Sequence, residues 1–231
     1  MVLHRATVRM TAASTSTSPR WVRSAAAAVA LFVVALLADH WFFHYSATPD
    51  LYGRGWARTL RMTGYFPFWA VVGLALVLHD WARSPQRRSA AARRGLLLFW
   101  STALGGLAAE LFKIVIRRER PGPNHGDWVF RAWSDRPFST AQLGLPSSEV
   151  AVAFAAAGAL ARLFPRGRAL WYALALMCAL LRVASGAHFL SDVVLAAFVG
   201  YLASEIVWRA AAIAHPAAAS MPETAVRSAT T

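Results

Sequence analysis

Six apolar stretches, each about as long as a bilayer is thick, restrict the fold of this chain more than any other feature. A membrane-spanning helix needs ~20 mostly apolar residues, and 57% of the 231 residues are hydrophobic, which is too many for an ordinary globular surface. The sequence therefore predicts an all-α fold, a polytopic six-transmembrane-helix bundle. The expected spans cover residues 24–45, 62–79, 95–116, 148–164, 169–185 and 190–213.

The segments outside these spans predict a simple domain organisation. Residues 1–20 are rich in Ser and Thr and lack hydrophobic periodicity, which predicts a disordered cytoplasmic tail. Residues 214–231 have a similar composition, which predicts a disordered C-terminal tail. Residues 21–213 are then expected to form one membrane domain, with its core motifs at 113–192. No small-x-small cleavage site follows the first apolar stretch, so we interpret that stretch as a retained anchor. Cys178 is the only cysteine, and we expect it to be a buried packing thiol.

The net charge of +13 does not indicate a nucleic-acid partner. Basic residues in a protein with several spans usually set its topology. The loops after the second and fourth spans are short and dense in arginine, which predicts that they and both termini are cytoplasmic. An Ala- and Arg-rich composition with a single lysine suggests a GC-rich bacterial genome. The outer face would then be periplasmic, in a bacterial inner membrane.

The outer end of the third span carries basic residues that topology does not require, in the stretch KIVIRRERP. On a helix, positions 113, 117 and 120 share one face and form a positive stripe that runs up to the helix end, where Pro121 pushes Arg120 out of helical geometry. We interpret Arg117 and Arg118 as side chains that reach for lipid headgroups. Lys113 lies deeper, where a charge needs a partner and indicates function, and Glu110, one turn below, is the expected partner.

Two further helix ends carry polar residues. In LPSSEV, Ser147 and Ser148 mark a helix N-terminus, where a hydroxyl caps the helix or helps to bind an anion. In LRVASGAHFLSDV, His188 and Asp192 are four residues apart, within reach of each other on one helix face. An Asp bonded to one imidazole nitrogen leaves the other nitrogen free as a nucleophile or base. Gly186 allows a sharp turn before the histidine.

Each motif alone has an ordinary structural explanation, but the combination indicates one kind of ligand. Three helix ends that are distant in sequence contribute cations, hydroxyls at a helix N-terminus and a His–Asp pair. If they converge, they suit a phosphate group with a nucleophile opposite its leaving group. The nearly thirty residues between 117 and 145 are a long loop for a compact bundle, which also favours a functional role.

These motifs resemble those of the type-2 phosphatidic acid phosphatase superfamily, which includes the vanadium haloperoxidases. The first family motif is Lys, six residues and Arg-Pro, and the chain matches it with Lys113, Arg120 and Pro121. The third is Ser-Arg, five residues, His, three residues and Asp. The chain matches it with Arg182, His188 and Asp192, although Leu181 stands where the family usually has Ser. The resemblance covers roughly residues 60 to 213.

The resemblance implies a reaction and a role for each matching residue. His188 would be the nucleophile that forms a phosphohistidine, oriented by Asp192. It implies no cofactor and no metal, because the cations do the electrostatic work that magnesium does in other phosphoryl-transfer sites. The implied substrate-binding residues donate to phosphate oxygens: Lys113, Arg120, Ser147, the backbone amide of Ser148, and Arg182.

The second motif departs from the family pattern of Pro-Ser-Gly-His. Here it reads Pro146-Ser147-Ser148-Glu149, so Glu149 replaces the histidine expected to protonate the leaving group. Either Glu149 is the catalytic acid, with a pKa raised by partial burial against the lowering effect of nearby cations and the helix dipole, or this step is impaired. An impaired enzyme would favour a substrate with a good leaving group, such as a diphosphate. His125, in the loop, is a third source of the proton.

The expected function is therefore that of an integral-membrane lipid phosphatase. Its partner is a phosphorylated lipid in the bilayer: a polyprenyl diphosphate, phosphatidate, phosphatidylglycerophosphate or a lipid A phosphate. Two alternatives are a catalytically impaired phospholipid-binding protein and a lipid phosphotransferase. A small-solute transporter lacks support, because the sequence has neither repeated halves nor a broken span. Nothing in the sequence indicates an oligomeric state.

Overall fold

The computed structural model describes residues 19–48, 50–83 and 88–214. The predicted all-α class is confirmed, because these ranges are organised around α-helices. The predicted tails fall almost entirely outside the described residues. The helices are α1 (Arg20–Ser46), α2 (Gly55–Arg61), α3 (Phe66–Arg83), α4 (Arg88–Ile116), α5 (Ser148–Leu163), α6 (Arg168–Ala184) and α7 (Leu190–Ala214).

The helices match the six expected apolar stretches in position, but the predicted count of six spans is not confirmed. Within the described ranges, four helices are long and apolar enough to cross a membrane, namely α1, α4, α6 and α7. The segments Gly55–Gly64 and Phe66–Arg83 would add a fifth span if this pair, bent by 67°, is counted as one. Helix α5 has only 16 residues, which is ~24 Å of helix against a hydrocarbon core of ~30 Å.

Helix α5 forms the centre of the bundle, and α4, α6 and α7 pack around it. Its sequence SEVAVAFAAAGALARL is rich in alanine, and small side chains let neighbouring backbones come close. A Cβ atom at Gly200 of α7 would lie 2.2 Å from the carbonyl oxygen of Ala151, so no larger residue fits there. Cys178 is buried and free beside this core, as expected.

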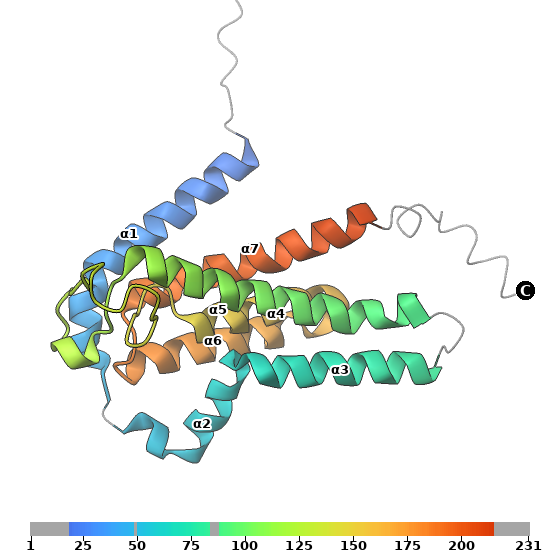
Figure 1. The fold of residues 1–231 in the computed structure, drawn as a ribbon, viewed down its shortest axis with the longest axis horizontal. Helices are drawn as coiled ribbons and strands as arrows, with labels where there is room; N and C mark the ends of the chain where they lie inside the picture. Colours follow the sequence, from blue (N-terminus) through green and yellow to red (C-terminus); the bar gives the residue numbers. More distant parts are fainter. Residues whose placement is uncertain (1–18, 49, 84–87, 215–231) are drawn as a thin grey trace, which may run out of the picture.

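The arrangement of the helices brings the predicted motifs to one end of the bundle (Figure 1). The C-terminal ends of α4 and α6 and the N-terminal ends of α5 and α7 lie at that end, beside the loop that joins α4 to α5. Helix α1 contacts α7 and α6 there, while its N-terminal half leans away from the bundle.

The loop begins directly after α4, as the expected span limits of 95–116 predict, but it does not carry the predicted positive stripe. Helix α4 ends at Ile116, and Arg117 takes a left-handed conformation with φ 59°. Residues 117 and 120 therefore do not share a helix face with Lys113, and the predicted stripe is wrong. The chain turns into two isolated antiparallel bridges, Arg118 with Phe130 and Glu119 with Leu143, which fold the loop back over the helix ends.

Candidate active site at the converging helix ends

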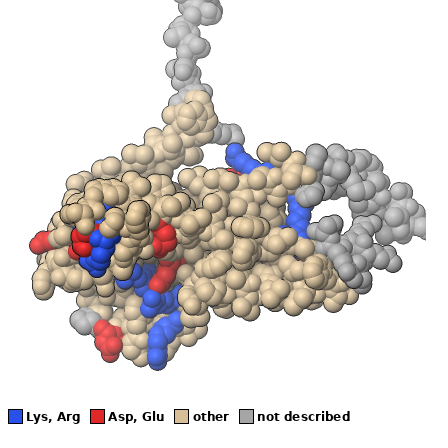
Figure 2. Space-filling view, viewed as in Figure 1, with Lys and Arg blue, Asp and Glu red and all other residues tan. Residues whose placement is uncertain are grey.

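Charged residues gather at the end of the bundle that carries the long loop and α2 (Figure 2). The middle of the same face is covered by uncharged side chains, and a few basic residues lie at the opposite end. Electrostatic repulsion couples Lys113 to Arg120 and Arg120 to Arg182, so cations from α4, the loop and α6 lie near one another. The convergence expected from the sequence is present.

His188 and Asp192 form a buried pair. The imidazole Nδ1 lies 3.2 Å from Asp192 Oδ2, and the two residues are 2% and 0% exposed. An ionised carboxylate can only accept, so the ring donates from Nδ1 and leaves the lone pair of Nε2 free. His188 lies in the turn before α7 rather than on a helix, and Gly186 provides the turn with φ 67°.

The surroundings of His188 favour its neutral form. Burial lowers the pKa of His188 to about 4, and the cations Arg182 and Arg120 act in the same direction. The hydrogen bond to Asp192 opposes this shift. A neutral imidazole with a free Nε2 is the form that can act as a nucleophile at neutral pH.

Lys113 is almost fully buried and has two partners. Its Nζ donates to Glu110 Oε1 at 2.8 Å and is also bonded to the hydroxyl of Ser148. The expected pairing of Lys113 with Glu110 is confirmed. Ser148 in turn donates to Glu110, so the first residue of α5 is joined to the last turns of α4.

Three of the predicted phosphate-binding residues keep a buried polar atom without a hydrogen-bond partner. These atoms are Nε of Arg120, Oγ of Ser147 and Nε of Arg182. Ser147 precedes α5 but forms no side-chain cap, so its hydroxyl is not used to stabilise the helix. Burial and the nearby Arg182 cation lower the pKa of Arg120 below its ordinary value. Buried donors without partners are costly, and an anion that bound all three would remove that cost.

Glu149 is held by two arginines. Its carboxylate accepts from Nε and Nη2 of Arg61, at 2.9 and 2.7 Å, and lies 3.2 Å from Nη1 of Arg182. Two guanidinium partners favour the ionised carboxylate. In this arrangement Glu149 neutralises Arg182 and has no proton to give.

Two residues interpreted as lipid-facing prove to be buried. Arg117 and Arg118 are 2% and 1% exposed, so the expectation that they reach for headgroups is wrong. Arg117 donates to four carbonyl groups of the loop, those of Arg131, Ala132, Asp135 and Pro137. Arg118 binds Asp192 through Nη2 at 2.6 Å. His125, the third expected source of a proton, is exposed.

Residues from the first 61 positions, which no sequence motif indicated as a group, also contact the site. Arg61 binds Glu149, Tyr52 accepts a hydrogen bond from Arg182 at 3.2 Å, and Asp39 is bonded to Arg118 at 3.3 Å. Only Asp39 carried a signal in the sequence, because an acid within an apolar span usually has a partner and a function. Among the described residues, no group of three His, Cys, Asp or Glu side chains could hold a metal ion.

The chain is similar in sequence to known proteins. Over 102 residues the chain is 38% identical to a lipid A 1-phosphatase of Rhizobium johnstonii and to another of Rhizobium etli. Each match covers 43% of this chain, and 41% and 43% of the relative, so the chain spans about two fifths of the length of these curated relatives. No solved structure matches. The model of the PAP2 superfamily matches residues 94–214, which include every predicted site residue, and the chain belongs to that family.

Proposed function

We propose that this protein is an integral-membrane phosphatase that hydrolyses a phosphate or diphosphate ester of a lipid through a phosphohistidine. The observation that carries the proposal is the buried His188–Asp192 pair beside Arg120 and Arg182, each with an unpaired Nε. The family and the two lipid A 1-phosphatase relatives support a lipid phosphate as substrate.

The first chemical step would be attack by His188. The lone pair of Nε2 forms a bond to phosphorus while the ester P–O bond breaks, and the lipid leaves with that electron pair. Asp192 accepts the Nδ1–H hydrogen bond and balances the positive charge that develops on the ring. Lys113, Arg120 and Arg182 would stabilise the charge on the equatorial phosphate oxygens. Ser147 and the backbone amide of Ser148, at the start of α5, add neutral donors.

The second step would return the enzyme to its starting state. Water attacks the phosphorus, the P–N bond breaks, and Nε2 regains its lone pair as inorganic phosphate leaves. The proton lost by the water passes to the lipid oxide released in the first step, or to solvent. Both steps balance without a further reactant.

Glu149 was expected either to be the catalytic acid or to leave protonation of the leaving group impaired. The geometry favours the impaired step. Its carboxylate is bound by Arg61 and Arg182. It acts as an internal anion that stays paired with Arg182, a proposed phosphate-binding residue, until a substrate arrives. Without a strong acid at this position, a leaving group that is a weak base departs most easily. We therefore expect a preference for a diphosphate, or another ester with a good leaving group.

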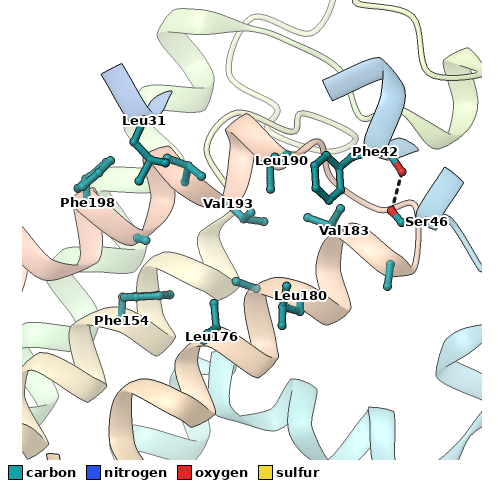
Figure 3. Close-up of a pocket in the computed structure, with 14 residues that line it drawn as sticks. Leu31, Phe42, Ser46, Phe154, Leu176, Leu180, Val183, Leu190, Val193 and Phe198 are labelled. Carbon is teal, nitrogen blue, oxygen red and sulfur yellow. Dashed lines mark hydrogen bonds between the residues drawn. The ribbon is translucent and has the colours of Figure 1, made fainter. Parts of the chain in front are cut away.

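An apolar cavity of about 480 Å³ provides room for the lipid chain (Figure 3). It lies between α1, α5, α6 and α7, and Leu31, Phe42, Leu180 and Phe198 are among its lining residues. Val183 also lines it, next in sequence to Arg182 of the site. We propose that the hydrocarbon chain lies in this cavity while the headgroup reaches the cations.

The location and the domain limits are part of the same proposal. The long apolar helices support an integral membrane protein. We propose cytoplasmic termini, a bacterial inner membrane and an active site on the periplasmic face. This follows from the arginine-rich loops after the second and fourth apolar stretches. Residues 21–213 would form the membrane phosphatase domain, with tails at 1–20 and 214–231.

The decisive experiment is a lipid phosphatase panel with the purified protein in detergent. The substrates are a polyprenyl diphosphate, phosphatidate, phosphatidylglycerophosphate and lipid A, and phosphate release is measured. We expect turnover on at least one substrate and its loss in His188→Ala. The control is His44→Ala, a histidine that is exposed on α1.

The alternatives predict different results in the same panel. A lipid-binding protein would retain labelled lipid phosphate without releasing phosphate, and Glu149 is the residue that favours this alternative. A phosphotransferase would release little phosphate until a second lipid is added as acceptor, and would then form a phosphorylated product. Turnover that persisted in His188→Ala would refute the phosphohistidine.

A further inference from the structure

A second buried ionic cluster lies directly behind Asp192 and involves α1, a helix outside the segment matched by the family model. Its members are Asp39 of α1, Arg118 of the loop and Ser191 of α7, which are 0%, 1% and 0% exposed. None of them is among the residues to which the resemblance assigns a role. Asp39 is an acid within a helix of mean hydropathy 2.1, where an unpaired carboxylate is costly.

Both oxygens of Asp39 are used. Oδ1 accepts from the backbone N–H of Ser191 at 2.8 Å, and Oδ2 accepts from its hydroxyl at 2.5 Å. Oδ2 also accepts a hydrogen bond from Nη1 of Arg118 at 3.3 Å. Asp39 therefore joins α1 to the first turn of α7 and to the guanidinium of Arg118.

Arg118 connects this cluster to the proposed nucleophile. Its Nη2 donates to Oδ1 of Asp192 at 2.6 Å and to the hydroxyl of Ser191 at 2.6 Å. The guanidinium also lies over the ring of Phe189, 4.9 Å from the centroid. With Oδ1 occupied, Asp192 presents Oδ2 to His188, and the N–H of Phe189 donates to the same oxygen at 2.9 Å.

The charges in this cluster determine how strongly Asp192 accepts the hydrogen bond from His188. One guanidinium is shared by two carboxylates, so Asp39 draws part of the positive charge away from Asp192. Without Asp39, Arg118 would interact with Asp192 alone and weaken the hydrogen bond that the imidazole Nδ1–H donates to Asp192. In a buried network such effects are strong, because little water screens them.

We propose that Asp39 is a positioning residue that acts through Arg118 and Asp192 to hold His188 in the tautomer with hydrogen on Nδ1. The inference rests on the proposed role of His188 as nucleophile. It adds that this chain's first helix is part of the catalytic apparatus.

The activity test compares Asp39→Asn with a matched control, Asp127→Asn, which neutralises an exposed acid of the loop. By analogy with the outer partners of metal-binding histidines, we expect kcat to fall about 10–100-fold in Asp39→Asn, with KM changed less than kcat. Asp39→Glu should recover part of the loss, because it restores the charge. Asp127→Asn should match the wild type.

The second test does not depend on turnover. The ¹⁵N chemical shifts of His188, assigned by comparison with His188→Ala, report which ring nitrogen carries the hydrogen. We expect the Nδ1–H tautomer in the wild type and a mixture of tautomers in Asp39→Asn. If that variant does not fold, Ser191→Ala removes one contact to Asp39 and keeps every charge. It should produce a smaller shift in the same direction.

The outcomes separate this inference from the proposed function. A wild type with no turnover but the Nδ1–H tautomer, lost in Asp39→Asn, would refute the phosphatase and keep the positioning role. A folded Asp39→Asn with an unchanged tautomer would overturn the positioning role whatever its activity. Asp39→Asn combined with Asp192→Asn should cost no more than Asp192→Asn alone, and additive losses would also overturn it.

Discussion

The carboxylate of Glu149 lies 3.2 Å from the guanidinium of Arg182, a cation that we propose binds the substrate phosphate. The residue at the position of the family's histidine is therefore paired with a cation of the proposed site. Arg61, from the segment before α3, holds the same carboxylate with two hydrogen bonds of 2.9 and 2.7 Å. A substrate phosphate that used Nη1 of Arg182 would have to displace Glu149, whereas Nε of Arg182 has no partner to displace.

Removal of this internal anion should strengthen substrate binding. In Glu149→Gln, Arg182 no longer faces a negative charge, so we expect KM for the lipid phosphate to fall about threefold to tenfold, which corresponds to about 0.7–1.4 kcal/mol. The dependence of kcat on pH should not change. Steady-state kinetics from pH 5 to 9 provide the measurement. If turnover were lost together with the alkaline limb of the pH profile of kcat, Glu149 would instead be the residue that protonates the leaving group.

A histidine at position 149 should change the choice of substrate. Glu149→His supplies the acid that the family motif contains, and a general acid contributes about 10²–10⁴-fold when the leaving group is a strong base. We expect the rate with phosphatidate to rise relative to the rate with a polyprenyl diphosphate, whose leaving group needs less help. The two initial rates, measured in the same detergent, give the ratio. Glu149→Ala is the control, since it removes the internal anion without adding an acid.

The protonation of His188 should make the protein less stable in mild acid. Its pKa is lowered from 6.5 to about 4 in the folded state by burial, so between these pH values the unfolded chain binds more protons. The stabilisation is present above pH 6.5 and is lost as the pH falls towards 4. From pH 7 to pH 5 we expect a loss of about 2 kcal/mol from this residue. Thermal unfolding of the wild type and of His188→Gln measures it, and equal losses in both would contradict the shift.

The loop over the site should depend on one buried arginine. Arg117 donates to four loop carbonyls, and each buried acceptor left without a donor costs about 1–3 kcal/mol. Arg117→Ala should therefore open residues 117–146 to proteolysis and reduce activity. Arg136→Ala is the control, because Arg136 is exposed and pairs with the exposed Asp135 of the same loop. Equal proteolysis of the two variants would contradict a role for Arg117 in loop order.

The sequence predicted the helices and the motif residues because both depend on local patterns. Apolar stretches locate helices within a few residues, and the spacing of Lys113, Arg120, Arg182, His188 and Asp192 depends on chemistry that recurs in the family. The structure adds the environment of each side chain. The positive stripe beyond α4 was mispredicted because Arg117 takes a left-handed conformation, stabilised by carbonyls up to 20 residues away.

The contacts from the first 61 residues could not be predicted in the same way. Asp39 meets Ser191 across 152 positions, and Arg61 meets Glu149 across 88. No spacing rule relates residues that far apart, so only the packing of α1 and the bend before α3 reveal them. Glu149 illustrates the consequence: the sequence left open whether burial or nearby cations would dominate, and the structure shows two arginines from other segments bound to its carboxylate.

The cavity between α1, α5, α6 and α7 should decide how the lipid chain binds. Ala197 of α7 lines it, and Ala197→Trp would fill part of the space without touching a charged site residue. A second apolar cavity, also about 480 Å³, provides a matched control on the same helix, since it is lined by Ala211. That cavity lies between α4 and α7, and its lining contains none of the proposed site residues.

We expect Ala197→Trp to raise KM for a long-chain lipid phosphate about tenfold or more, because burial of each CH₂ group contributes ~0.8 kcal/mol. Hydrolysis of a water-soluble short-chain phosphate should be nearly unchanged, since its chain does not reach the filled region. Ala211→Trp should behave as the wild type with both substrates. If Ala197→Trp and Ala211→Trp had equal effects, the hydrocarbon chain of the lipid would have to bind outside this cavity. A loss of activity towards the short-chain substrate in Ala197→Trp would indicate damage to the site itself.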